Sequence, residues 1–271
     1  MIATTTIGRA SIITKLLSIG IPFILSEKPI CSSISEMENI MYYLKNSESN
    51  LAINHQMRYL PQYKRVKELV YKEDFGGLIS MHVLGGNFGF AMNGSHYVEA
   101  FRYITGSCTK SVRAELETEN EYSPRGEIFK EASGTANIKS ENNKLMTINC
   151  SNKNHYGRSV SYVCKYGIIY VDELSGNLYA TYRKEEFRNQ PSYKYGLPAE
   201  IIRENIDAVE TSYSTSLLLN DLLKDGDYPT ANQAINAIKT IVACYYSSRK
   251  NGSEIKLKDL DKKNQEIFKW A

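Results

Sequence analysis

Short apolar runs alternate with longer amphipathic stretches in the first quarter of the chain. Met1 to Thr6 is typical of the end of a strand, and Phe23 to Leu25 and Leu51 to Asn54 predict two further buried strands. Two helices are predicted between them from apolar residues at helical spacing: Ile12, Ile13, Leu16 and Leu17, then Ile34, Met37, Ile40, Met41 and Leu44. The order strand, helix, strand, helix, strand favours a parallel, doubly wound sheet.

A different pattern begins after a helix that starts at Pro61 and a turn at Asp74 to Gly77. Seven segments are strand candidates: Leu78 to Leu84, Val112 to Thr118, Ala132 to Lys139, Leu145 to Cys150, Val160 to Cys164, Ile168 to Val171 and Leu178 to Tyr182. Helices are predicted over Ser95 to Thr105 and, later, over 208–224 and 231–248, and a short strand over Glu254 to Leu257. We therefore expect an α/β domain at 1–74 and a larger α+β domain at 75–271, with a mostly antiparallel open sheet covered by helices on one face.

The first domain is expected to be an incomplete Rossmann-like sheet. A chain that opens inside a strand leaves that sheet with only about three strands, fewer than usual. Nowhere in the sequence do two glycines stand in G-x-G spacing, so the dinucleotide fingerprint G-x-G-x-x-G is absent. The sequence therefore predicts a truncated nucleotide-binding domain.

Composition removes several classes of partner. The 33 basic and 30 acidic residues are mixed along the chain, without the basic stripe of a nucleic-acid binder. Five cysteines without a C-x-x-C pair argue against a disulfide framework or a zinc knuckle and favour a reducing cytoplasm. No apolar run is long enough to span a bilayer, so we expect no membrane partner. The 20 tyrosines are most simply explained by sheet faces and subunit contacts.

Lys28 and His96 are the strongest candidates for chemistry. Lys28 follows the buried strand together with Glu27, and Pro29 disfavours a helical conformation for it, so its amine is expected at the ligand-binding rim of the sheet. His96 is expected in the first turn of the Ser95 to Thr105 helix, where the helix dipole keeps an imidazole neutral and able to act as a base. A surface lysine and a half-buried structural histidine are the alternatives.

The sequence contains no motif for a metal site, a serine hydrolase or a P-loop enzyme. His55, His82 and His155 are weaker candidates, and no two histidines have metal-ligand spacing, so we expect no metal site. The sequence contains neither a G-x-S-x-G elbow nor a P-loop, which excludes the common serine hydrolases and the P-loop nucleotide triphosphatases.

Taken together, these motifs resemble the Gfo/Idh/MocA family of NAD(P)-dependent oxidoreductases, which act on sugars, inositols and nucleotide sugars. Ile2 to Thr6 looks like the family's fourth Rossmann strand, Glu27 to Pro29 its lysine motif, and Asn54 to Pro61 its N-x-R-[FY]-x-P-type segment. Gly76 to Ser80 is similar to the opening of the family's second domain, and Gly94 to Gly106 to its catalytic-histidine helix. The resemblance covers essentially the whole chain.

The resemblance implies roles for particular residues. Lys28 would hydrogen-bond the reacting hydroxyl near the nicotinamide of NAD or NADP, and His96 would exchange the hydroxyl proton as hydride moves. The family commonly has an aspartate four residues before its histidine, where this chain has Met92, so Asn93 is included as a third catalytic candidate. The peptide bond before the proline is often cis in the family. The cofactor-binding candidates are Thr4, Thr5, Glu27, Lys28, Pro29 and Arg58.

Two hypotheses follow. The first is an oxidoreductase, truncated and impaired in cofactor binding, that acts on a sugar, nucleotide sugar or cyclitol. The second is a non-catalytic remnant that serves as a carbohydrate-binding or oligomerisation module. Both predict a homo-oligomer, a dimer or tetramer, because an uncovered sheet face needs a partner.

Overall fold

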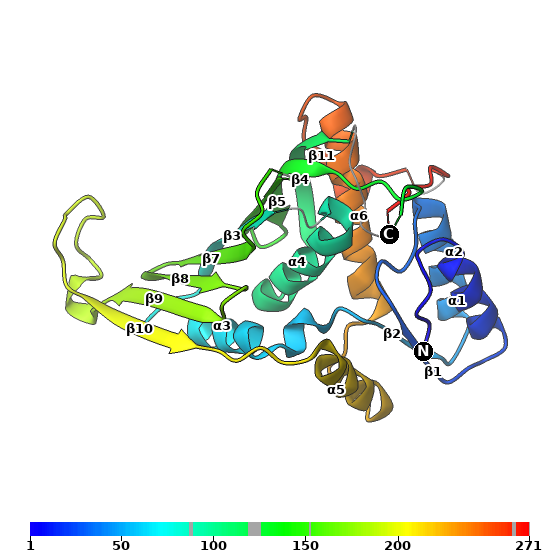
Figure 1. Cartoon of the computed structure of the whole chain (residues 1–271), viewed down its shortest axis with the longest axis horizontal. Helices are drawn as coiled ribbons and strands as arrows, with labels where there is room; N and C mark the ends of the chain where they lie inside the picture. The colour runs from blue at the N-terminus through cyan, green and yellow to red at the C-terminus, as the bar shows by residue number, and fades with distance from the viewer. Residues whose placement is uncertain (87–88, 119–125, 152, 262–263, 271) are drawn as a thin grey trace.

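The computed structural model describes residues 1–86, 89–118, 126–151, 153–261 and 264–270. Helices α4 and α6 lie between a large sheet on one side and a small sheet with α1 and α2 on the other (Figure 1). One hydrophobic core runs through both parts and includes Val70 and Phe75, on either side of the expected domain boundary. The boundary after residue 74 stays a prediction.

The small sheet is parallel, as predicted. Strands β1 (Phe23–Ser26) and β2 (Asn50–Ile53) pair in register, and Ile2 adds one bridge to Ser26. The strand expected over Met1 to Thr6 is therefore reduced to Ile2, because the chain bends at Thr4 before helix α1. The helices of this part are α1 (Arg9–Ser18), α2 (Ile34–Lys45) and α3 (Pro61–Tyr71), with the 3₁₀ turn η1 (Gln56–Tyr59) before α3.

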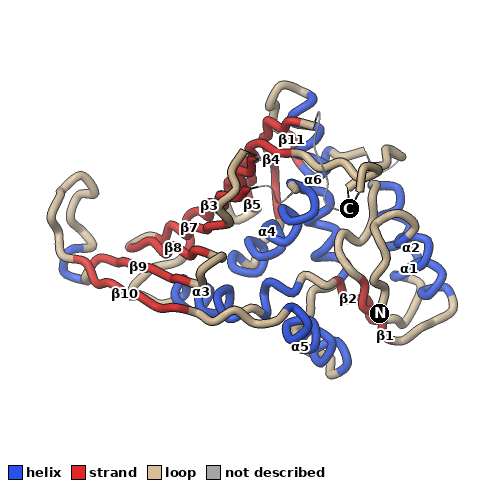
Figure 2. The backbone as a smooth tube through the Cα atoms, viewed as in Figure 1, coloured by secondary structure: helices blue, strands red, loops and turns tan. Residues whose placement is uncertain are grey.

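The large sheet has the predicted, mostly antiparallel character. Its nine strands are ordered β10-β9-β8-β7-β3-β6-β5-β4-β11, and the β3–β6 pair alone is parallel. Their bounds are β3 (Leu78–Gly86), β4 (Thr109–Glu117), β5 (Ser133–Ser140), β6 (Leu145–Ser151), β7 (Arg158–Cys164), β8 (Gly167–Asp172), β9 (Asn177–Arg183), β10 (Ala199–Asn205) and β11 (Ile255–Lys256). Strand β10 was not predicted. The hairpin of β9 and β10 and its long connection extend away from the body (Figure 2).

Three helices complete the fold. Helices α4 (Phe90–Thr105) and α6 (Ala231–Arg249) cover one face of the large sheet, and α5 (Thr211–Leu223) packs beside β1 and η1. The turn between α5 and α6 docks on the small sheet, where Ile53 N donates to Pro229 O at 2.9 Å. Within the described residues, no helix has the length and apolar character needed to cross a membrane. All five cysteines are free thiols.

Candidate functional site

The end of β1 directs Glu27 and Lys28 to different neighbours, as expected from the alternation of side chains along an extended chain. Asn54, at the end of β2, donates through Nδ2 to Glu27 Oε1 at 2.6 Å. The Lys28 amine donates to the carbonyl oxygen of Met92 in α4 at 2.5 Å, and the lysine is 8% exposed. The Lys28–Pro29 peptide bond is cis, as the resemblance implied. The lysine thus joins the edge of the small sheet to the helix that carries His96.

Helix α4 begins earlier than predicted, which changes the setting of His96. The backbone N–H groups of Ala91 and Met92 donate to Glu131 Oε2 at 2.8 and 3.2 Å, so a carboxylate from the loop before β5 caps the helix. Gly89 precedes the helix with φ +70°, and a Cβ there would lie 3.0 Å from the Glu131 side chain. The prediction that His96 lies in the first turn of its helix was therefore wrong, because α4 starts at Phe90 and His96 falls in the second turn. That its imidazole is neutral stays a prediction.

His96 packs against a second histidine. The rings of His55 and His96 are 5.5 Å apart between centroids and meet edge to face at 86°. His55 is 2% exposed, and its Nδ1 has no hydrogen-bond partner in the part of the chain that the structure describes. Burial, and then the charges of Lys28, Arg102 and Arg58, lower the pKa of His55 to about 3. A neutral imidazole therefore lines the candidate site beside His96.

Arg58, predicted to bind cofactor, is itself buried and takes part in an ionic network. Its guanidinium pairs with Asp227 Oδ1 at 2.7 Å and with Glu99 Oε1 at 3.8 Å. Glu99 also binds Arg102 at 2.7 Å, and the Tyr103 ring lies 5.1 Å from the Arg58 guanidinium. These contacts join η1 to α4 and to the turn before α6, so they give Arg58 a structural role at this interface. Its role in cofactor binding stays a prediction.

Thr4 and Thr5 lie in an exposed loop that leads into α1. The buried side chain of Arg9 donates to the carbonyl oxygens of both Thr4 and Pro29. Arg9 therefore ties this loop to the peptide that follows Lys28, and it brings most of the predicted cofactor-binding residues to the same edge of the small sheet. No local pattern indicates this role of Arg9, because the two hydrogen bonds join separate loops.

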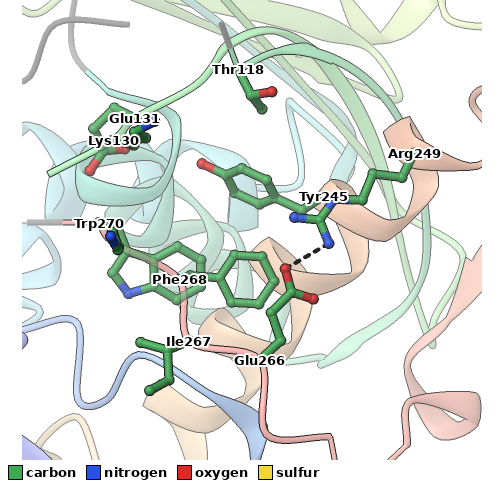
Figure 3. Close-up of a pocket in the computed structure, with 10 residues that line it drawn as sticks. Thr118, Lys130, Glu131, Tyr245, Arg249, Glu266, Ile267, Phe268 and Trp270 are labelled. Carbon is green, nitrogen blue, oxygen red and sulfur yellow. Dashed lines mark ion pairs between the residues drawn. The ribbon is translucent and has the colours of Figure 1, made fainter.

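Two cavities are lined by residues described above: Glu27 and Asn54 line one, and Glu131 lines the other. One, of about 660 Å³, is lined by Glu27, Asn54 and apolar residues of β1 and α5, among them Leu25 and Leu222. The other, of about 650 Å³, lies beside Glu131. Its remaining wall is formed largely by α6 and the C-terminal tail, with Tyr245, Arg249, Glu266, Phe268 and Trp270 around it (Figure 3).

The C-terminal tail supports the loop after Lys28. The rings of Phe268 and Trp270 stack at 4.8 Å, and Trp270 Nε1 donates to Cys31 O at 3.4 Å. The backbone N–H of Phe268 also donates to Ser32 O at 2.9 Å. Sequence reasoning missed this support, because no pattern in the last ten residues indicates what they contact. No group of three or more metal-ligating side chains occurs among the residues that the structure describes.

No protein-family model matches the sequence, and no curated protein is similar enough to count as a relative. Solved structures, in contrast, align over most of the chain. An oxidoreductase from Agrobacterium radiobacter, in complex with NAD+, L-tartaric acid and magnesium, aligns with a TM-score of 0.74 over 94% of this chain and 79% of its own, at 13% identity. A protein from Desulfitobacterium hafniense described as an NADPH-dependent oxidoreductase aligns with a TM-score of 0.75 over 95% of this chain and 79% of its own, at 12% identity.

The chain has the Gfo/Idh/MocA oxidoreductase fold. The fold expected from the resemblance is thus confirmed. The transcriptional regulator Gal80p from Kluyveromyces lactis has the same fold, with a TM-score of 0.71 over 95% of this chain and 76% of its own, at 14% identity. Identities this low establish the shared fold, and the site residues must carry any conclusion about activity.

Proposed function

We propose that this protein is an NAD(P)-dependent oxidoreductase that moves a hydride between the cofactor and a hydroxyl or keto carbon of a sugar, nucleotide sugar or cyclitol. The contact between the Lys28 amine and the Met92 carbonyl carries this proposal. It places a cation one helical turn from His96, beside the carboxyl ends of two parallel strands, where open α/β sheets bind ligands. Lys28 stabilises the developing alkoxide, and His96 exchanges the hydroxyl proton.

The residues of the candidate site suit the nicotinamide end of NAD or NADP better than its pyrophosphate. Two neighbours of this fold are described with NAD+ and as NADPH-dependent, and bound nicotinamide would accept or supply the hydride. Thr4, Thr5, Lys28 and Pro29 share the sheet edge that Arg9 holds together, which suits the nicotinamide end. The sequence has no G-x-G spacing for the pyrophosphate, so we assign no residue to that group.

Calorimetric titration with NADH and NADPH tests the cofactor assignment. We expect weak binding or none for residues 1–271, and tighter binding once a strand and G-x-G-x-x-G loop are joined before Met1. If the extended protein bound neither cofactor, the oxidoreductase proposal would fail. Tight binding by residues 1–271 alone would contradict the expected impairment.

A second candidate is a non-catalytic carbohydrate-binding or oligomerisation module. The observation that favours it is the structural similarity to Gal80p, which is a transcriptional regulator of the same fold. If the protein extended before Met1 bound sugar but transferred no hydride, this candidate would be supported over the enzyme.

Under either function, we propose that the open face of the large sheet meets a second copy of the chain. Large side chains stand exposed on β3, β8, β9 and β10 of this sheet: Leu84, Ile168, Tyr170, Tyr179 and Ile201. Exposed apolar patches of this kind mark interaction surfaces. We therefore expect light scattering to give the mass of a dimer or tetramer, and a monodisperse monomer would contradict this assignment.

A further inference from the structure

The first three backbone N–H groups of α4 all donate to the loop before β5. Phe90 N donates to Ala132 O at 2.9 Å. The N–H groups of Ala91 and Met92 donate to Glu131 Oε2 at 2.8 and 3.2 Å. The N–H groups in the first turn of an α-helix have no partner within the helix, so they depend on groups outside it. Residues 131 and 132 therefore fix where α4 begins.

The Glu131 carboxylate is buried at this helix start. The residue is 3% exposed, and Gly89 provides the space for it, since a Cβ on Gly89 would lie 3.0 Å from the Glu131 side chain. A buried polar group is costly unless it is hydrogen-bonded, and a negative charge is favourable at a helix N-terminus. The carboxylate therefore stabilises the first turn of α4 through its two hydrogen bonds and its charge.

Glu131 and Lys28 bind the same residue of α4. Met92 donates its N–H to Glu131, and its carbonyl oxygen accepts the Lys28 amine at 2.5 Å. In an α-helix the carbonyl oxygen of residue 92 is also the acceptor for the N–H of residue 96, so the Lys28 amine and the His96 backbone meet at one oxygen atom. The position of Met92 thus sets the separation of Lys28 from His96.

The C-terminal tail ties the loop before β5 to the loop after Lys28. Lys130 N, next to the capping residue, donates to Lys269 O at 2.6 Å. The neighbouring tail residue Phe268 donates its N–H to Ser32 O at 2.9 Å. The lysine, the start of α4, the capping loop and the tail therefore form a closed ring of contacts. Both sides of the lysine contact are anchored to the same segment of the tail.

We infer that Glu131 is a positioning residue for the reaction: it holds Met92 where the carbonyl oxygen receives the Lys28 amine, and so keeps that amine beside His96. Glu131 acts through Lys28 and takes no part in proton or hydride transfer. The inference rests on the proposed function, which assigns the developing alkoxide to Lys28 and the proton to His96. We expect loss of Glu131 to leave the fold intact, with the amine correctly placed for a smaller fraction of the time.

Acetylation of the lysines by acetic anhydride, followed by peptide mass spectrometry, tests this contact in residues 1–271 without cofactor or turnover. Lys28 is 8% exposed, so its amine should react mainly when its contact with Met92 opens. Glu131→Ala should raise the acetylation rate of Lys28 about fivefold, which is the usual effect of losing a helix cap. Glu131→Gln keeps a side-chain oxygen that accepts a hydrogen bond, so it should restore most of the protection.

Asp172→Ala is the matched control variant. Asp172 is another buried carboxylate that accepts a backbone N–H, from Leu174 at 3.0 Å, but it lies at the end of β8. Its loss should leave the acetylation rate of Lys28 unchanged. Lys67, whose amine lies 3.6 Å from the centre of an aromatic ring, is the internal reference for general loosening. An unchanged Lys28 rate in Glu131→Ala, or an equal rise for Lys67 or in Asp172→Ala, would overturn the inference.

A double-mutant cycle in the protein extended before Met1 tests whether the effect passes through Lys28. Glu131→Ala should lower kcat about fivefold with little change in KM, in step with the acetylation rate. Lys28→Ala should leave a measurable rate, because loss of one stabilising donor typically lowers kcat by about 10² to 10³. In that background Glu131→Ala should lower kcat by less than about twofold, since the group that it positions is gone. Equal losses in both backgrounds would overturn the inference. A Glu131-dependent Lys28 rate in a protein that transfers no hydride would support the contact while refuting the oxidoreductase proposal.

Discussion

His96→Asn is expected to lower kcat for hydride transfer by a factor of about 10² to 10⁴, the usual contribution of a positioned general base. Asparagine preserves a polar side chain at this buried position but cannot accept the hydroxyl proton. Substrate KM should change little, because Lys28 remains. The measurement is the steady-state rate at which the protein extended before Met1 forms reduced nicotinamide, across a pH series.

His82→Asn serves as the control for this variant. His82 lies in β3, where Nε2 is 2.9 Å from the Ser80 hydroxyl, and it lines a separate cavity with residues of β4, β5 and β6. Its replacement should leave kcat and the pH profile unchanged. Unchanged turnover in His96→Asn would exclude His96 as the base, and an equal loss in both variants would indicate a general effect of removing a histidine.

The sequence predicts the fold wherever burial leaves a local pattern. Strands β1 and β2 and helices α1 and α2 appear where apolar spacing placed them, and Ser33 caps α2 by accepting from Glu36 N at 3.1 Å. Strand β10 shows no such pattern, because it lies at the sheet edge with most of its residues exposed. It exists through its register with β9, in which Ile201 opposes Thr181. A strand of this kind depends on its partner rather than on its own alternation.

The site is less predictable than the fold, because its contacts join distant segments. The motif at Glu27 to Pro29 and the helix with His96 could be identified from their sequences, yet the bond from Lys28 to Met92 spans 64 positions. The start of α4 was misplaced because Asn93, Gly94 and Ser95 look like capping residues, whereas the actual cap is the Glu131 carboxylate. The hydrogen bond from Arg158 to Asn93 in α4 has no local signal either, since only the pairing of β3 with β7 brings the two residues together.

The stability of the protein is expected to fall in acid because of His55. The pKa of this histidine drops from 6.5 to about 3 on folding, mainly through burial and then through the charge of Lys28. Between these pH values the unfolded chain binds a proton that the folded chain does not, so the stabilisation is fully present above pH 6.5 and is lost as the pH falls toward 3. From neutral pH to two units below 6.5, the free energy of unfolding should decrease by roughly 3 kcal/mol from this group.

His55→Asn isolates this contribution from that of the carboxylates, which titrate in the same acidic range. Urea unfolding of both proteins over a pH series should give curves whose difference changes by roughly 3 kcal/mol, with the unmodified protein losing more stability in acid. His155→Asn is the control for the loss of a histidine, because the His155 side chain is exposed. Parallel curves for the unmodified protein and His55→Asn would mean that the folded protein accommodates a charged His55. The imidazole beside His96 would then carry a positive charge in acid, and proton exchange at His96 would have to occur next to that cation.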